Sequence, residues 1–107
     1  MASFGNFIPA DNSTVTLACT TSTGARQFRA SIDVGLSVRI YNAGPDVAYV
    51  RFTNATSTAT APSGATVGGM PIPVGDIEVF PAGTATFISA LCPTSTATLF
   101  VTVGEGS

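Results

Sequence analysis

Two acidic side chains have a spacing that could support carboxylate chemistry. Asp76 and Glu78 lie two residues apart in an expected strand, which places them on the same face of that strand. Two carboxylates are the minimum for a calcium contact or for a two-carboxylate glycosidase. Calcium, however, takes about six to eight oxygen ligands, and no Asp- and Asn-rich loop supplies the others. We therefore interpret the pair as a strand face that is solvated or paired with arginine.

Hydrolytic and metal chemistry lack their usual side chains in this chain. The 107 residues contain no histidine, so neither a Ser–His nor a Cys–His nucleophile can be built, and the commonest general base and metal ligand is missing. Cys19 and Cys92 are far apart in the sequence and form no CxxC pair for zinc. We expect no catalytic residue, no metal and no cofactor, and therefore a protein that is not an enzyme.

The composition favours assembly. Only 9% of the residues are charged, against about 25% in an average domain, and the net charge is −2. The cations are arginines that form no basic stripe, so nucleic acid is not an expected partner. No apolar run reaches the length of about 18 residues that a membrane-spanning helix needs, so no membrane is expected either. A small domain with so few charges tends to self-associate, which predicts a defined oligomer or a larger assembly.

The N-terminus and the cysteines indicate a protein made and used without export. The first residues lack the cationic segment and the continuous apolar run of a secretory signal peptide. Cys19 and Cys92 could form a disulfide if their strands are neighbours. Two buried thiols are nevertheless the expectation for a protein made in the cytosol.

Apolar and polar residues alternate with a period of two along much of the chain, and no segment has a helical apolar stripe. Residues 70–75 contain two prolines at alternate positions, which indicates an extended edge or corner. The expected strands are residues 14–20, 27–32, 36–41, 47–52, 77–80, 85–91 and 97–103. The predicted fold is all-β, a single-domain antiparallel β-sandwich or small jelly roll.

The clearest local expectation is a hairpin of residues 36–41 and 47–52, joined by the turn formers of residues 42–46. One face of this hairpin would be apolar, with Leu36, Val38, Ile40, Ala48, Val50 and Phe52. The opposite face would collect Arg39, Tyr41, Tyr49 and Arg51. Tyrosine and arginine are enriched at binding hot spots, and tyrosines can stack on sugars. Three interpretations of this face are open. It is a solvated sheet surface whose arginines lie near Asp76 or Glu78, or it is a protein interface, or it is a glycan-binding site.

Two further segments could contact neighbouring molecules. Residues 1–12 are predicted to form an extended N-terminal arm, in which Phe4, Phe7 and Ile8 pack either on their own domain or on a neighbour. Residues 54–69 are rich in Thr, Ala, Ser and Gly and are predicted to form a long surface loop.

Five segments occur in the order VRIYNAG, VAYVRF, MPIPVG, IEVF and ATLFVTVGEG, at residues 38–44, 47–52, 70–75, 77–80 and 97–106. This arrangement, which spans about two-thirds of the chain from about residue 36 to 106, resembles small structural proteins of tailed bacteriophages. The first 35 residues match no such pattern.

The resemblance implies a virion protein with a β-sandwich or jelly-roll fold. Its expected role is that of a decoration or cement protein on the capsid exterior, commonly trimeric, with the major capsid protein as partner. A fibre, baseplate or carbohydrate- and receptor-binding module is the alternative, since related β-modules occur there. No catalytic residue is implied.

Overall fold

A computed structural model describes residues 7–22, 24–32, 34–53 and 68–105. These residues form strands and turns and no helix, and hence no helix that could span a membrane. The strands are β1 (Ile8–Cys19), β2 (Ala25–Gln27), β3 (Ser37–Pro45), β4 (Ala48–Thr53), β5 (Met70–Ile72), β6 (Ile77–Pro81), β7 (Phe87–Leu91) and β8 (Ala97–Glu105).

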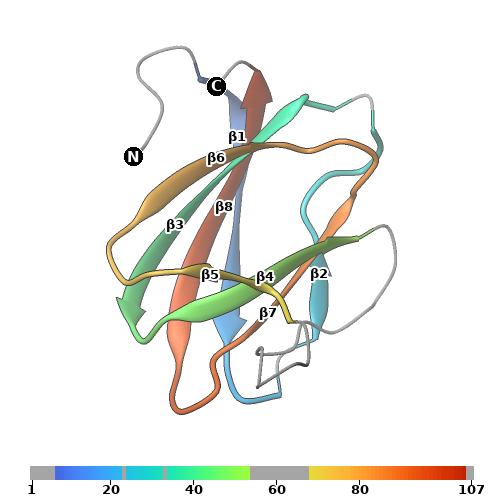
Figure 1. Cartoon of the computed structure of the whole chain (residues 1–107). Coiled ribbons are helices and arrows are strands. Elements are labelled where there is room, and N and C mark those ends of the chain that lie inside the picture. Colours follow the sequence, from blue (N-terminus) through green and yellow to red (C-terminus); the bar gives the residue numbers. More distant parts are fainter. Residues whose placement is uncertain (1–6, 23, 33, 54–67, 106–107) are drawn as a thin grey trace.

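The strands form two antiparallel sheets (Figure 1). Sheet A has the order β1-β8-β3-β6, and sheet B has the order β2-β7-β4-β5. The prediction of an all-β chain with antiparallel sheets is confirmed. The prediction of an edge element in the proline-containing segment is confirmed as well, because β5 is an edge strand of sheet B.

The predicted hairpin is wrong. β3 pairs with β8 and β6 in sheet A, whereas β4 pairs with β7 and β5 in sheet B. The residues between them therefore carry the chain from one sheet to the other. The turn-forming residues of this connection are compatible with a hairpin within one sheet and with a crossing between two sheets. They bend the chain in either case and do not determine which strand pairs with which.

Asn42, near the end of β3, organises the passage from β3 to β4 from a fully buried position. Its Nδ2 donates hydrogen bonds to the carbonyls of Ile72 at 2.8 Å and Asp46 at 3.0 Å, and its Oδ1 accepts from the Gly44 amide at 2.7 Å. Gly44 has φ +86°, and a Cβ there would lie 2.8 Å from Cγ1 of Val74. Both the backbone conformation and the close approach therefore require glycine at this position.

The inner faces of the two sheets share one apolar core. Alternate residues of the central strands point inward, as the period-two pattern predicts. Fully or nearly fully buried side chains come from both sheets, among them Val38, Ile40, Leu99, Val101, Val50, Ile88 and Ala90. Leu36 was expected in this core but is 64% exposed, because β3 begins only at Ser37.

A buried arginine lies at the end of the fold where β8 finishes. Arg29 is 4% exposed. Its Nε donates to the Ala85 carbonyl at 2.7 Å, its Nη1 to that of Gly35 at 2.5 Å, and its Nη2 to that of Gly83 at 2.9 Å. Nη1 also lies 3.4 Å from two further carbonyl oxygens of the segment that precedes β3. The guanidinium thus links the β2–β3 and β6–β7 connections.

Several predicted boundaries change. Residues 8–12 belong to β1, where Ile8 pairs with Glu105 and Pro9 with Gly104, so this part of the expected arm is a strand of sheet A. The strand expected at residues 27–32 is shorter and earlier, at β2. Residues 1–6 of the arm and 54–67 of the expected long loop lie outside the described residues.

Candidate functional site

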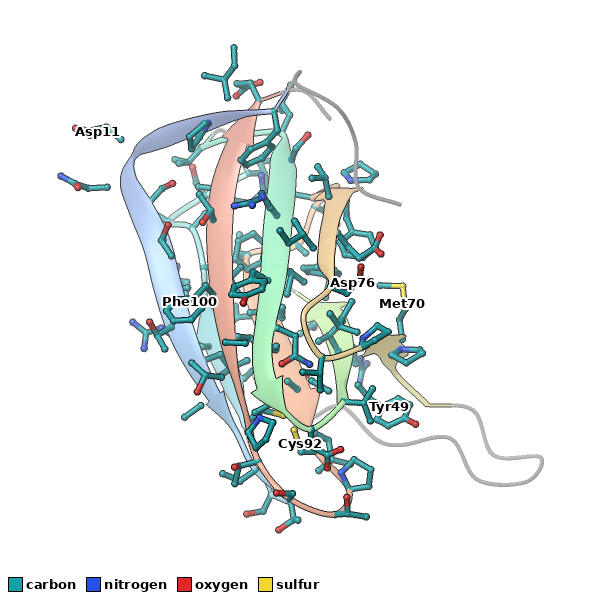
Figure 2. The ribbon with its side chains drawn as sticks, turned by 90° about the vertical axis from the view of Figure 1, so that its left-hand side faces the viewer. Asp11, Tyr49, Met70, Asp76, Cys92 and Phe100 are labelled. Atoms are coloured by element: carbon teal, nitrogen blue, oxygen red, sulfur yellow. The ribbon has the colours of Figure 1, made fainter. Side chains whose placement is uncertain are left out.

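The predicted group of Arg39, Tyr41, Tyr49 and Arg51 is divided between the two sheets. Arg39 and Tyr41 lie on β3, and Tyr49 and Arg51 lie on β4. Because the buried residues of both strands point into the shared core, these four side chains point outward from opposite faces of the molecule. In Figure 2, Phe100 of sheet A and Tyr49 of sheet B lie well apart. The prediction of one combined surface is therefore wrong.

Tyr41 has a different aromatic partner. Its ring stacks on that of Phe100, with centroids 6.2 Å apart and planes inclined by 19°. The two residues are direct register partners on the adjacent central strands β3 and β8. Tyr41 is 36% exposed and Phe100 is 38% exposed, so the pair presents apolar area to the outside.

The aromatic pair belongs to a row that crosses all four strands of sheet A. The register places Thr16 of β1 beside Phe100, and Ile77 of β6 beside Tyr41. We call this row of Thr16, Phe100, Tyr41 and Ile77 the aromatic row. It carries no charged side chain.

A second row runs parallel to the first, two residues along each strand. It contains Thr14, Thr102, Arg39 and Val79, and the hydroxyls of Thr14 and Thr102 are 2.7 Å apart. Arg39 is the single charge among the eight residues of the two rows. The outer face of sheet A is therefore largely uncharged and rich in threonine.

The dimensions of this face limit what it can bind. Four strands about 4.8 Å apart and nine residues that each rise about 3.3 Å give a face of about 14 by 27 Å, or about 400 Å². A stable protein–protein interface buries about 800 Å² on each partner. The outer face of sheet A can thus supply about half of such an interface.

The outer face of sheet B offers a partner less exposed aromatic surface than the outer face of sheet A does. Tyr49 pairs in register with Leu91 and Pro71, and both Tyr49 and Leu91 are half-buried. Arg51 is exposed beside Ser89, which is fully buried. The apolar atoms that sheet B turns outward are thus partly covered, in contrast to Phe100.

The expected N-terminal contact residues separate from one another. Ile8 is 67% exposed at the start of β1. Phe7 is half-buried and packs on its own domain, since a Cβ added to Gly104 would lie 2.9 Å from Cζ of Phe7. Phe4 lies outside the described residues. The arm was predicted to pack either on its own domain or on a neighbour, and Phe7 packs on its own domain.

Asp76 and Glu78 interact directly with each other, whereas the sequence predicted only that they share a strand face that is solvated or paired with arginine. A hydrogen bond with Asp76 raises the pKa of Glu78, with smaller contributions from desolvation and from repulsion by the Asp76 charge. A hydrogen bond between two carboxyl groups requires that one of them is protonated. Among the described residues, no group of three or more His, Cys, Asp and Glu side chains could hold a metal ion.

The Asp76→Asn variant is expected to return the pKa of Glu78 toward its ordinary value, because it removes both the carboxyl partner and its charge. A raised pKa in the folded state means that protonated Glu78 favours folding. This contribution is complete below the ordinary pKa and is lost as pH rises through the folded-state pKa. Carboxyl NMR titration of Glu78 measures the shift, with Asp11→Asn as the control, and an unchanged Glu78 titration in Asp76→Asn would contradict the pairing.

The chain matches no protein-family model, and no curated protein or solved structure is significantly similar to it. We therefore infer a function from the geometry of the described residues and from the resemblance of the short segments at residues 38–106.

Sequence reasoning missed Phe100 and Ile77 as members of the candidate surface. Phe100 could have been found, because Leu99 and Val101 on either side of it are core residues and the period of two then turns Phe100 outward. Ile77 could not, since its position beside Tyr41 depends on the pairing of β6 with β3.

Proposed function

We propose that the chain is a structural protein of a tailed-phage virion, a decoration or cement protein on the capsid exterior. In this proposal the fold is a β-sandwich of the jelly-roll type, the protein is a homotrimer, and its partner is the major capsid protein. It stabilises the capsid through protein–protein contacts, without catalysis.

The exposed Tyr41–Phe100 stack on an almost uncharged sheet face is the observation that carries this proposal. Aromatic residues at the centre of a patch, surrounded by uncharged residues, are typical of the energetic centre of a protein interface. Threonine hydroxyls around the pair can hydrogen-bond to a partner without the desolvation cost of a charge.

The limited area of the face is consistent with repeated weak contacts. A single copy offers about 400 Å² there, which favours weak binding by itself. Three copies linked in a trimer would bind with a high effective local concentration, so weak contacts would add up on a symmetric lattice. A capsid supplies such a lattice.

The variant Phe100→Thr is expected to weaken binding to capsids assembled without the chain by about 30-fold, the effect of losing about 2 kcal/mol at an interface centre. Threonine suits a strand and already occupies the neighbouring outward positions Thr98 and Thr102, so the sheet should be retained. Co-sedimentation with the capsids measures the binding, and light scattering measures the oligomer, for which we expect about three times the chain mass of 10.8 kDa.

Tyr49→Thr is the matched control, because it removes an aromatic side chain from the outer face of sheet B. It should bind capsids as the unaltered chain does. Equal losses in both variants would mean that the outer face of sheet A has no special role. A monomer that does not sediment with capsids at any concentration would contradict the proposed function.

A carbohydrate- or receptor-binding module of a fibre or baseplate is the second candidate. The same exposed rings of Tyr41 and Phe100 favour it, since aromatic rings can stack on sugars. A trimer that ignores capsids but binds glycans of the host surface, and loses this binding in Tyr41→Thr, would support it over the capsid role.

A further inference from the structure

The two cysteines are neighbours in space although they are 73 positions apart in the sequence. Cys19 is the last residue of β1 in sheet A, and Cys92 directly follows β7 of sheet B. The Cys92 thiol donates a hydrogen bond to the Cys19 sulfur, and the two Sγ atoms are 2.9 Å apart. The Cys92 amide also donates a hydrogen bond to the Thr20 carbonyl at 3.0 Å, which holds the two segments together.

The distance between the sulfurs is close to that of a bond. A disulfide has an S–S length of about 2.04 Å, so the sulfurs need to approach by about 0.9 Å. The hydrogen bond from the Cys92 amide to the Thr20 carbonyl already holds the two backbone segments side by side, so only this short approach of the sulfurs is needed. Both side chains are buried, Cys19 at 1% and Cys92 at 0% exposure.

We propose that Cys19 and Cys92 form an intramolecular disulfide that covalently joins sheet A to sheet B. The reaction is thiol–disulfide exchange with a small disulfide such as oxidised glutathione. One cysteine thiolate attacks the small disulfide, forms a mixed disulfide and releases one thiol; the second cysteine then displaces the other. The two protein thiols lose two electrons and two protons, and two molecules of the small thiol are formed.

The burial of the pair determines when this reaction can occur. Burial raises the pKa of the Cys92 thiol, and the Asp46 charge contributes in the same direction, against a hydrogen bond with Cys19 that lowers it. The attacking species is the thiolate, so the folded, reduced protein reacts slowly. Oxidation is fast when this end of the molecule is open, during folding or after partial unfolding, and refolding then encloses the bond.

The disulfide would lie at the end of the fold opposite to Arg29, whose hydrogen bonds join the β2–β3 and β6–β7 connections. Cys19 pairs in register with Ala97 at the start of β8, whereas Arg29 binds the Gly35 carbonyl near the end of β8. Figure 2 shows Cys92 at the lower end of the strands. The oxidised chain would thus be held at both ends, which suits a protein that must persist outside a reducing cell.

The test is oxidation of the purified chain with reduced and oxidised glutathione, once under native conditions and once in urea followed by refolding. We expect slow loss of both thiols from the folded chain and rapid loss from the unfolded chain. Digestion without reductant should give one linked peptide pair that contains Cys19 and Cys92. The thermal midpoint of the refolded oxidised chain should exceed that of the reduced chain by about 10 °C or more, because the disulfide closes a long loop.

Cys92→Ala is the control, since it keeps Cys19, which can form only a mixed disulfide and cannot close the bond; oxidant should not raise its midpoint. Each midpoint is compared with that of the same variant without oxidant, so a cost of the substitution itself does not affect the result. The proposal is overturned if the oxidised, refolded chain retains two thiols, forms only intermolecular disulfides, or melts below the reduced chain. None of these measurements involves capsids, so they are independent of the proposed function.

Discussion

The Arg29→Met variant is expected to lose about 3 kcal/mol or more of its free energy of unfolding. Methionine fills much of the space of the aliphatic stem but leaves the carbonyls of Gly35, Gly83 and Ala85 without their short bonds of 2.5 to 2.9 Å. The bond to Ala85 is buried and those to Gly35 and Gly83 are partly buried, and each such acceptor that loses its donor costs about 1 kcal/mol. Urea denaturation followed by circular dichroism measures the loss as a lower midpoint.

Arg26→Met is the matched control, because Arg26 is exposed on β2, only three residues away. Its effect should stay within about 0.5 kcal/mol. Arg29→Lys should recover only part of the stability, since a single ammonium cannot reproduce the planar fork that reaches three carbonyls in two connections. Similar midpoints for Arg29→Met and Arg26→Met would contradict the prediction, because they would show that water replaces Arg29 as the hydrogen-bond donor to the three carbonyls.

Asn42→Ala is expected to destabilise the protein by a similar amount, about 3 kcal/mol. The substitution removes all three side-chain hydrogen bonds and leaves the carbonyls of Ile72 and Asp46 and the amide of Gly44 without these partners. Because Asn42 is fully buried, its truncation also leaves a cavity beside these unpaired groups, which adds to the cost. The free energy of unfolding in urea measures the effect.

Ser95→Ala, on the exposed connection that precedes β8, is the control and should change stability little. Asn42→Asp gives a second readout, because it keeps the acceptor for Gly44 and loses the amide donors. Burial disfavours the charged form of the introduced carboxyl, so this variant should gain stability relative to the unaltered chain as pH is lowered. Variants at Asn42 that match Ser95→Ala would contradict the organising role of Asn42.

The candidate surface could be predicted from the sequence only in part. The period of two correctly turns Arg39 and Tyr41 to one side of β3 and buries Val38 and Ile40 on the other. The predicted hairpin places Tyr41 on one face with Tyr49, because proximity in the chain favours pairing of consecutive strands. Phe100, 59 positions later, is the actual neighbour of Tyr41.

Arg29 and Asn42 show where composition misleads. Arginine and asparagine are mostly exposed in proteins, so a sequence pattern assigns them to the surface or to turns. Both are buried here because backbone carbonyls that are distant in the sequence meet their side chains. Such a site exists only once these segments are brought together, and local sequence carries no sign of it.

The all-β class, the inward and outward positions along the central strands and the low charge can be predicted from side-chain types and their spacing along the chain. These properties are local, since they depend on side-chain type and on the period of the extended backbone. Strand pairing, the separation of β3 and β4 into different sheets and the contact of Cys19 with Cys92 depend instead on long-range packing. A strand has two edges that accept any partner with matching backbone groups, so the choice among partners depends on how the whole core packs.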